Sequence, residues 1–372
     1  MPYLDCRTTL KKGQDVLNSW GMITLPGLID IHVHLRTPGQ QHKEDFLTGT
    51  SAALAGGFTV VCDMPNNQQP VTSLERLEEK MKIAEQQIVC DTGFYFGSLG
   101  GNLEEFEKVK DKVFGIKLYL NITTGNFLID EEKLIKIYES WPSNQPILLH
   151  CEGETLPMAL RVIKKTGKKT HICHVSSKEE LSQIMQGKDE GLDITCGVTP
   201  HHLFLTEDDA KRLGPLGLMK PFLKKQEDLD FLCHYLDKID LIESDHAPHT
   251  KEEKELDNPP FGVPGLETTL PLLLTAAAEG KLTIEDITRL CHTNPAQIFN
   301  IPTDENTKVE VDENEEYEIK QEDLKTKCGW SPFAGRKVKG KVKTVFIRGE
   351  KVFEDEKILA EKGSGKIIYP NP

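Results

Sequence analysis

Short runs of β-branched and other apolar residues recur along the chain at intervals of about 20 to 40 residues. Stretches between them show the spacing of an amphipathic helix, as in 73–87, where apolar residues recur every three or four positions. The predicted strands are 28–35, 58–63, 90–96, 115–120, 146–150, 170–175, 192–198 and 239–244. Eight strands alternating with helices predict an α/β fold, a TIM (β/α)8 barrel.

The pattern changes near residue 300. Residues 304–327 are rich in Glu, Asp and Lys, and 340–353 have the pattern of a hairpin. We interpret the acidic stretch as a solvated loop and an edge strand rather than a binding tail, because lysines interrupt it. We expect the tail to form a small β domain with the N-terminal residues. The chain then divides into 1–22, a barrel over 23–300 that we expect to carry the functional site, and 301–372, which completes the small domain.

The composition limits the classes of binding partner and the cellular compartment that we expect. The 372 residues are 38% hydrophobic and 28% charged, which is typical of a globular protein, and the formal charge is −14. This charge argues against nucleic acid and anionic membranes as partners and favours small molecules or proteins. Nine cysteines without a Cys-x-x-Cys pair fit a reducing compartment. We find no signal peptide and no apolar run near the ~20 residues of a membrane span, so we expect a cytoplasmic protein.

Two histidines in the first barrel strand suggest a metal. Because side chains alternate along a strand, His32 and His34 share one face, while Ile31, Val33 and Leu35 share the other. A His-x-His pair alone is weak evidence, since a strand can carry two partly buried histidines with ordinary hydrogen bonds. Metal ligation and this ordinary role are about equally plausible for the pair in isolation.

Other candidate residues fall at the ends of further predicted strands, where a barrel of this kind builds its active site. The six are His32, His34, Lys117, His150, His174 and Asp245. Each has an ordinary alternative: the lysine could extend to the surface, a histidine could be a hydrogen-bonded core residue, and the aspartate could cap a turn. Six such residues on one barrel rim make a joint accident improbable.

Five segments carry a resemblance to a known family: 27–36, 62–66, 115–119, 171–175 and 244–249. With them the whole chain resembles the amidohydrolase superfamily with binuclear metal sites, and within it the dihydroorotases. The dihydroorotase domains of the CAD-type multifunctional proteins of animals are the most similar type. The resemblance implies a homodimer and a place within a larger multifunctional polypeptide.

The resemblance also implies the metal ligands. His32, His34 and Asp245 would hold one zinc ion, and His150 and His174 a second. Lys117, carboxylated by carbon dioxide, would bridge the two, because a carbamate on a long stem offers an anionic oxygen to each ion. Desolvation lowers the pKa of a buried lysine and so provides the neutral amine that captures carbon dioxide. A third, accessory metal near Cys173 is left open.

The implied reaction is the reversible cyclisation of N-carbamoyl-L-aspartate to L-dihydroorotate in de novo pyrimidine biosynthesis. A hydroxide that bridges the metals would attack the ring amide, and Asp245 would carry the proton to the leaving nitrogen. Arg36, Asn66 and His249 match the family's positions for binding the substrate carboxylate. Without the family context, Arg36 could be a surface charge and Asn66 a turn residue. Two alternatives remain: an inactive scaffold domain, and a hydrolase of another cyclic amide, such as a dihydropyrimidinase or allantoinase.

Three positions depart from the animal pattern. Gly197 stands where a glutamate is usual, so Cys173 is either a metal neighbour or a buried thiol. Lys220, a predicted substrate-binding residue, replaces an arginine and loses its forked geometry. Residues 121–127 resemble the loop that closes over the site. In that loop, Thr123 matches the residue that touches substrate, and Thr124 replaces an aromatic. We expect Thr123→Ala to lower kcat/KM several-fold.

Overall fold

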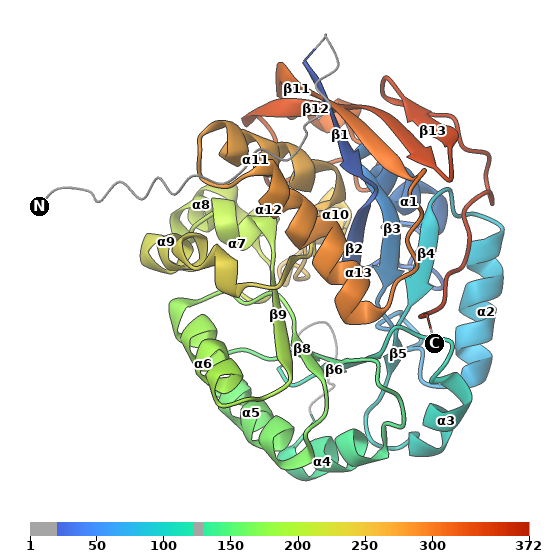
Figure 1. Ribbon diagram of the computed structural model, residues 1–372, viewed down its shortest axis with the longest axis vertical. Helices are drawn as coiled ribbons and strands as arrows, with labels where there is room; N and C mark the ends of the chain where they lie inside the picture. Colours follow the sequence, from blue (N-terminus) through green and yellow to red (C-terminus); the bar gives the residue numbers. More distant parts are fainter. Residues whose placement is uncertain (1–20, 122–128, 372) are drawn as a thin grey trace, which may run out of the picture.

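The computed structural model describes residues 21–121 and 129–371. Thr123, Thr124 and most of the predicted loop lie outside the described residues. Residues 1–20 of the predicted N-terminal segment also lie outside them. A ring of helices surrounds parallel strands, and an antiparallel sheet of mainly C-terminal strands lies at one end (Figure 1). The predicted TIM barrel with a small β domain is confirmed. Its division at residues 22 and 300 stays a prediction.

All eight predicted barrel strands are present, the third in two pieces. They are β2 (Leu28–Val33), β3 (Phe58–Asp63), β4 (Asp91–Phe94) with β5 (Phe96–Gly97), β6 (Ile116–Tyr119), β7 (Ile147–His150), β8 (Thr170–Ile172), β9 (Ile194–Val198) and β10 (Leu241–Ile242). The pairs within the runs β2-β3-β4 and β5-β6-β7-β8-β9-β10 are parallel. A parallel bridge between Val33 and His246 links the last strand to the first.

Strand β2 departs from the predicted alternation. Ile29 and Ile31 pack inside the barrel, whereas Val33 and Leu35 belong to the core beneath the outer helices. The pairing of β2 with β3 is irregular between Asp30 and Val33, and such a break in register reverses the face of the side chains that follow. The prediction that Ile31 shares a face with Val33 and Leu35 is therefore wrong.

The helices cover the outside of the barrel. They are α1 (Phe46–Ala55), α2 (Leu74–Glu85), α3 (Phe106–Val109), α4 (Glu131–Ser140), α5 (Thr155–Thr166), α6 (Lys178–Asp189), α7 (Pro200–Phe204), α8 (Glu207–Leu213), α9 (Gln226–His234), α10 (Lys251–Lys254), α11 (Leu266–Ala278), α12 (Ile284–Thr288) and α13 (Asn294–Phe299). Helix α2 lies where the apolar spacing predicts one, and the Ser73 side chain caps it by accepting from the backbone N–H of Arg76.

The small sheet joins both ends of the described chain. Its strands run in the order β1 (Met22–Pro26), β11 (Lys308–Glu318), β12 (Lys337–Ile347), β13 (Glu350–Glu354) and β14 (Lys357–Ile358). The predicted hairpin corresponds to β12 and β13. The acidic strand β11 is not an edge strand over 308–312, because β1 pairs with it on one side and β12 on the other. Its inward residues Val309 and Val311 are fully buried.

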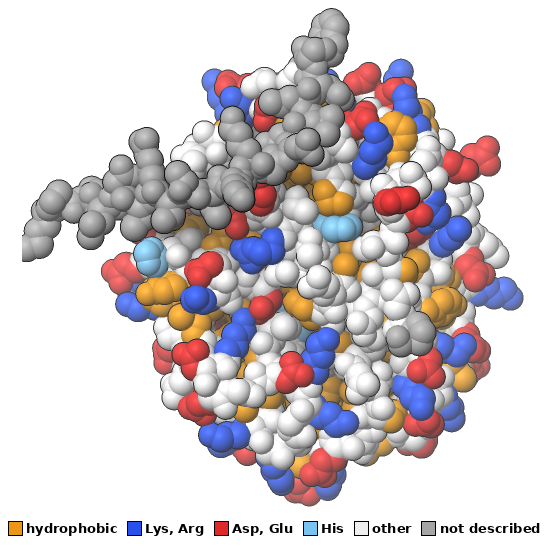
Figure 2. Space-filling model, in the orientation of Figure 1, with side chains coloured by type: hydrophobic (Ala, Val, Ile, Leu, Met, Phe, Trp, Pro, Cys, Tyr) orange, Lys and Arg blue, Asp and Glu red, His pale blue; other side chains and the backbone are white. Residues whose placement is uncertain are grey.

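The visible face of the molecule mixes acidic and basic side chains (Figure 2). Exposed Lys and Arg alternate with Asp and Glu there, and a broad basic area is absent from the described part of that face. None of the helices in the described ranges is long and apolar enough to cross a membrane.

Candidate metal centre and substrate pocket

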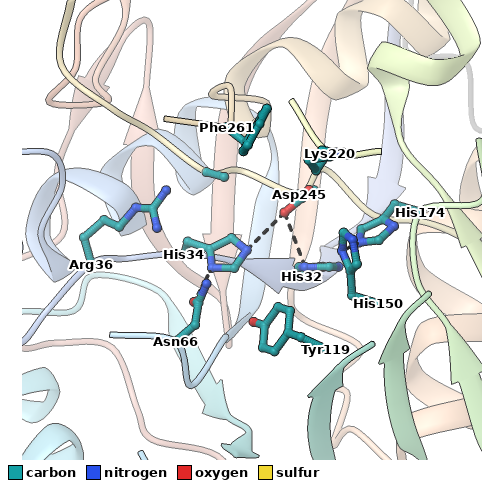
Figure 3. A pocket seen from close by; sticks show the side chains of 12 residues that line it. His32, His34, Arg36, Asn66, Tyr119, His150, His174, Lys220, Asp245 and Phe261 are labelled. Carbon is teal, nitrogen blue, oxygen red and sulfur yellow. Dashed lines mark hydrogen bonds and ion pairs between the residues drawn. The ribbon is translucent and has the colours of Figure 1, made fainter. Parts of the chain in front are cut away.

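Five of the six predicted strand-end residues line one pocket at the carboxyl ends of the barrel strands (Figure 3). The five are His32, His34, His150, His174 and Asp245. They come from β2 and the residue that follows it, the end of β7, and the segments after β8 and β10, and each is at most 8% exposed. Polar groups from distant parts of the sequence thus converge in one open pocket, whose empty volume, open solvent included, is about 400 Å³.

The two histidines at the end of β2 point at the same carboxylate oxygen. The Nε2 atoms of His32 and His34 lie 3.3 and 3.1 Å from Asp245 Oδ1. Burial acts to raise the pKa of Asp245, but the two histidines outweigh it and hold that pKa well below its usual range. Asp245 is therefore a carboxylate at neutral pH, with two imidazole nitrogens beside it.

Hydrogen bonds at Nδ1 fix the orientation of both rings. His32 Nδ1 lies 2.7 Å from Glu243 Oε2, and His34 Nδ1 lies 2.7 Å from Asn66 Oδ1. Because both partners are acceptors, each Nδ1 can serve as the donor, which leaves each Nε2 to face Asp245 or a bound cation. Metal-binding histidines are held in this way in many proteins, so the arrangement suits a cation at the Nε2 atoms.

His150 and His174 form a second pair. Nδ1 of His150 lies 2.8 Å from Nε2 of His174, and burial lowers the pKa of both rings. Their other nitrogens, Nε2 of His150 and Nδ1 of His174, are buried and have no hydrogen-bond partner among the described residues. Nδ1 of His150 and Nε2 of His174 are close enough to bind the same cation, which would replace their mutual contact. The nitrogen-rich set fits zinc.

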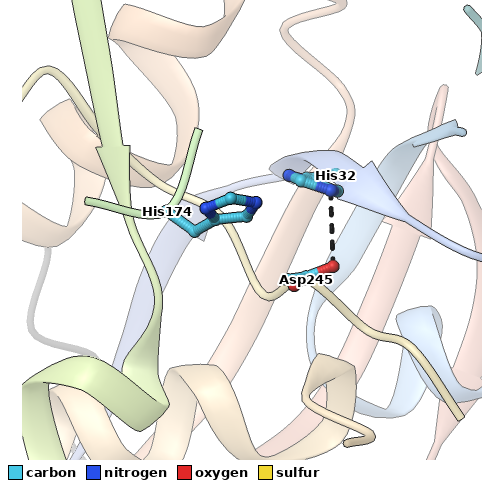
Figure 4. Close-up of side chains that lie close together, drawn as sticks. All are labelled: His32, His174 and Asp245. Atoms are coloured by element: carbon cyan, nitrogen blue, oxygen red, sulfur yellow. Dashed lines mark ion pairs between the residues drawn. The ribbon is translucent and has the colours of Figure 1, made fainter. Parts of the chain in front are cut away.

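One group of three possible metal ligands contains residues of both predicted metal sites. One ligand atom each from His32, His174 and Asp245 lies within 4.8 Å of the other two (Figure 4). The left-handed backbone at His174 and Asp245, with φ of 42° and 45°, helps bring their side chains into the pocket. Such strained conformations cluster at functional sites.

Lys117 lies beside this group, in β6. Its side chain is 1% exposed, and its ammonium donates to Cys173 Sγ at 2.9 Å. No carboxylate of the described residues lies within ion-pair distance of it. Burying an ammonium that has no carboxylate partner is unfavourable.

The predicted carboxylate-binding residues line the far wall of the pocket or lie just behind it. Arg36, held at φ 60°, lies 3.1 Å through Nη2 from Nε2 of the buried His249. Burial and the nearby Arg36, Lys43 and Lys254 keep the pKa of His249 far below its ordinary value, so the ring is neutral. Arg36 therefore supplies the positive charge, and Asn66 faces the same space (Figure 3).

Lys220 is at the pocket mouth. Its ammonium lies 4.0 Å from the centre of the Phe222 ring and 3.9 Å from Glu152 Oε1. The side chain is 22% exposed. It contributes a positive charge at the entrance, and among the described residues it forms no hydrogen bond or ion pair with Arg36 or Asn66.

Comparisons with known proteins agree with this geometry. An amidohydrolase family model matches residues 23–127. The multifunctional protein CAD of Squalus acanthias is 44% identical over 360 residues, which are 96% of this chain and 16% of that protein. A dihydroorotase of Pyrococcus abyssi is 38% identical over 370 residues, with 94% of this chain and 88% of that enzyme covered. The chain belongs to the dihydroorotase family.

Solved structures place this dihydroorotase-family chain among the barrels of its superfamily. An L-hydantoinase from Arthrobacter aurescens matches with a TM-score of 0.90 at 26% identity, over 94% of this chain and 89% of that one. An inactive dihydroorotase-like domain of a Chaetomium thermophilum CAD-like protein matches with a TM-score of 0.81 at 24% identity, over 93% and 99%. The second likeness shows the fold alone.

Sequence reasoning missed Glu243. This fully buried carboxylate contacts His32 through Oε2 and accepts the backbone N–H of His174 at Oε1. Burial acts to raise its pKa, but His32 and His171 outweigh burial and keep the pKa well below the usual range. Its place two residues before Asp245, at the end of the same strand, was the available signal. Glu243 also occupies the space beside Gly197, where a side-chain Cβ would lie 2.3 Å from Oε1.

Proposed function

We propose that this dihydroorotase-family chain is a zinc-dependent dihydroorotase, which interconverts N-carbamoyl-L-aspartate and L-dihydroorotate. The observation that carries the proposal is one pocket that joins the histidines around Asp245 to Arg36 and Asn66. The histidines and Asp245 suit a metal-dependent attack on a cyclic amide, and Arg36 with Asn66 suits an anionic substrate. The dihydroorotases at 38% identity and lower, matched over most of their length, support the same activity.

Two zinc ions fit the residues present. We assign His32, His34 and Asp245 to one, and His150 and His174 to the other, with a carbamate on Lys117 as the shared ligand. The short distance between Nδ1 of His150 and Nε2 of His174 and the buried lysine without a carboxylate partner support this assignment. When bound, zinc supplies a Lewis acid for the amide carbonyl and makes water acidic enough to react near neutral pH.

Asp245 moves the proton. Its low pKa keeps it ionised, so in ring opening it can accept a proton from the attacking water and return it to the ring nitrogen that leaves. In ring closure the same carboxylate accepts a proton from the ureido nitrogen. Its position against His32 and His34 holds it on the pocket side of the barrel.

Recognition of the substrate carboxylate is assigned to Arg36, Asn66 and His249. A guanidinium binds a carboxylate through two parallel hydrogen bonds, and here the buried setting strengthens that contact. Lys220 adds a positive charge where an anionic substrate enters. Thr123 remains a prediction from the sequence, because it lies outside the described residues.

Cys173 is proposed to be a buried thiol rather than a ligand of a third metal. His32, Cys173 and Glu243 do lie close enough together to hold an ion. Burial, however, raises the pKa of the thiol and disfavours the thiolate that a metal needs, while Glu243 is already engaged with His32. Metal analysis of the zinc-loaded protein should give two zinc ions per chain; three would support the accessory site.

The setting of the domain is also a proposal. The chain spans 16% of the length of the multifunctional relatives from Squalus acanthias and Dictyostelium discoideum that it matches. We propose that it works as one domain of a longer pyrimidine-biosynthesis polypeptide in the cytoplasm. The expected homodimer stays a prediction.

The experiment that tests the proposal compares two substrates. The zinc-loaded chain is assayed for ring opening with L-dihydroorotate and with 5,6-dihydrouracil, which is the same ring without the carboxylate. We expect turnover of dihydroorotate at least ~100-fold faster in kcat/KM, because the clamp contacts are lost with dihydrouracil. Preference for dihydrouracil would indicate another cyclic-amide hydrolase. No turnover of either substrate with zinc bound would indicate an inactive scaffold.

A further inference from the structure

A lysine lies on the buried face of helix α2. The other buried residues of that helix are Leu77, Met81 and Ala84, which pack against the barrel, yet Lys80 shares their face and is 0% exposed. Lysine is almost never fully buried unless it is paired. The contacts of Lys80 therefore indicate which segments of the chain it connects.

Three oxygen atoms surround the Lys80 ammonium. Nζ lies 2.8 Å from Asp63 Oδ2, and it donates to the Met64 carbonyl at 2.8 Å and to Asn67 Oδ1 at 2.9 Å. Asp63 is itself 1% exposed, and its other oxygen accepts the backbone N–H of Leu35 at 2.8 Å. One buried ion pair thus connects α2 to the chain that leaves β2 and to the chain that leaves β3.

These contacts bracket two residues of the pocket. Arg36 lies between Leu35, which is bonded to Asp63, and Pro38, whose carbonyl accepts from Asn67 Nδ2 at 3.4 Å. Asn66 lies between Met64 and Asn67, which both accept from Lys80. Each pocket residue is therefore anchored on both sides by the same network, although neither forms a hydrogen bond or ion pair with Lys80 itself.

We propose that Lys80 and Asp63 are positioning residues that hold Arg36 and Asn66 in the arrangement that binds the substrate carboxylate. The inference rests on the proposed function. A buried ion pair is poor evidence of stabilisation, since its desolvation offsets much of its attraction. Fixing two loops relative to each other explains its presence better, because small displacements of binding groups weaken catalysis strongly.

The test is Lys80→Met, assayed with L-dihydroorotate at saturating zinc. We expect KM to rise about tenfold or more, and by a larger factor than kcat falls, since Lys80 touches none of the groups around Asp245 and is linked to them only through Asn66 and His34. Lys82→Met, an exposed position on the same helix, is the matched control. Ile184→Ala, in the buried face of α6, controls for lost stability alone. Both controls should leave KM unchanged.

A double-mutant cycle separates positioning from general damage. If Lys80 acts through Arg36, then Lys80→Met should lower kcat/KM by less than about threefold in an Arg36→Met background. Asp63→Asn, which keeps the acceptor for Leu35 and removes the charge, should reproduce the KM effect if Lys80→Met does not fold.

The proposal would be overturned if the loss of kcat/KM in the double variant equals the product of the losses in the two single variants. A fall in kcat with unchanged KM in Lys80→Met would also overturn it. An unchanged KM in both single variants would do the same. The wild-type chain is measured in parallel, so that absence of any dihydroorotate turnover there counts against the proposed function and not against the role of Lys80.

Discussion

Gly197 provides the sharpest structural prediction, because its missing side chain leaves room for Glu243. A Cβ at this position would lie 2.3 Å from Oε1 and 2.8 Å from Cδ of Glu243, and 2.9 Å from Cδ1 of Leu241. In Gly197→Ala, the carboxylate must move by about 1 Å to reach an ordinary contact. It has no open side to move toward, since it is fully buried and bonded to His32 and His174.

The expected losses follow from these contacts. Overpacking a filled site lowers the free energy of unfolding by ~1–3 kcal/mol. Disturbing the partner of a metal-binding histidine weakens metal affinity by about 10- to 100-fold. Urea unfolding measures the first quantity, and competition of the zinc-free protein with a chromophoric chelator measures the second. Gly101→Ala is the control, because nothing lies within 4 Å of a Cβ there.

A cycle with Glu243→Ala identifies the cause. Glu243→Ala should itself weaken zinc binding, because His32 loses its acceptor. Adding Gly197→Ala to that variant should then cost little further affinity, since the clashing carboxylate is gone. The reasoning is refuted if Gly197→Ala binds zinc as wild type does, or if its penalty is undiminished when residue 243 is alanine.

Three further predictions concern other parts of the site and its surroundings. Arg36→Met should lower kcat/KM for dihydroorotate by ~100-fold through loss of charge-assisted hydrogen bonds to the carboxylate, and steady-state kinetics that match wild type would contradict the clamp. Lys117→Met should reduce bound zinc from two ions per chain to one or none and lower kcat by at least ~1000-fold; metal analysis showing two ions would count against the carbamate. His201 is buried, and burial lowers its pKa from 6.5 to about 4, so the unfolded chain takes up its proton first as the pH falls. The stability that this histidine contributes above pH 6.5 is therefore lost between about pH 6.5 and 4. Between pH 7.5 and 5, the free energy of unfolding measured with urea should fall by ~2 kcal/mol more for wild type than for His201→Leu. Equal losses in the two proteins would show that the ring is protonated in the folded state.

The local sequence pattern was enough to predict the barrel strands and the candidate residues at their carboxyl ends. The runs of apolar residues gave all eight barrel strands, and the rule that barrel sites lie at carboxyl ends of strands led to His32, His150, His174 and Asp245. These features depend on short stretches of sequence, whose periodicity reflects burial directly.

What the sequence did not reveal depends on contacts between distant segments. The pairing of β1 with β11 turns an acidic stretch into an inner strand, and no property of that stretch alone indicates it. The contact of Lys80 with Asp63 and the space that Gly197 leaves for Glu243 join residues that only the barrel brings together. The irregular register of β2 reverses the face of its side chains and is equally invisible in the pattern of residues.

The activity itself is tested most directly by the rate of ring opening of L-dihydroorotate, followed as loss of its ultraviolet absorbance, by the zinc-loaded chain and by its Asp245→Asn variant. Zinc content is measured in both samples. We expect a clear rate for the wild type and a loss of at least ~1000-fold in the variant, because the group that moves the proton is gone. No rate in a wild-type sample that holds two zinc ions, or an undiminished rate in the variant, would contradict the proposed enzyme.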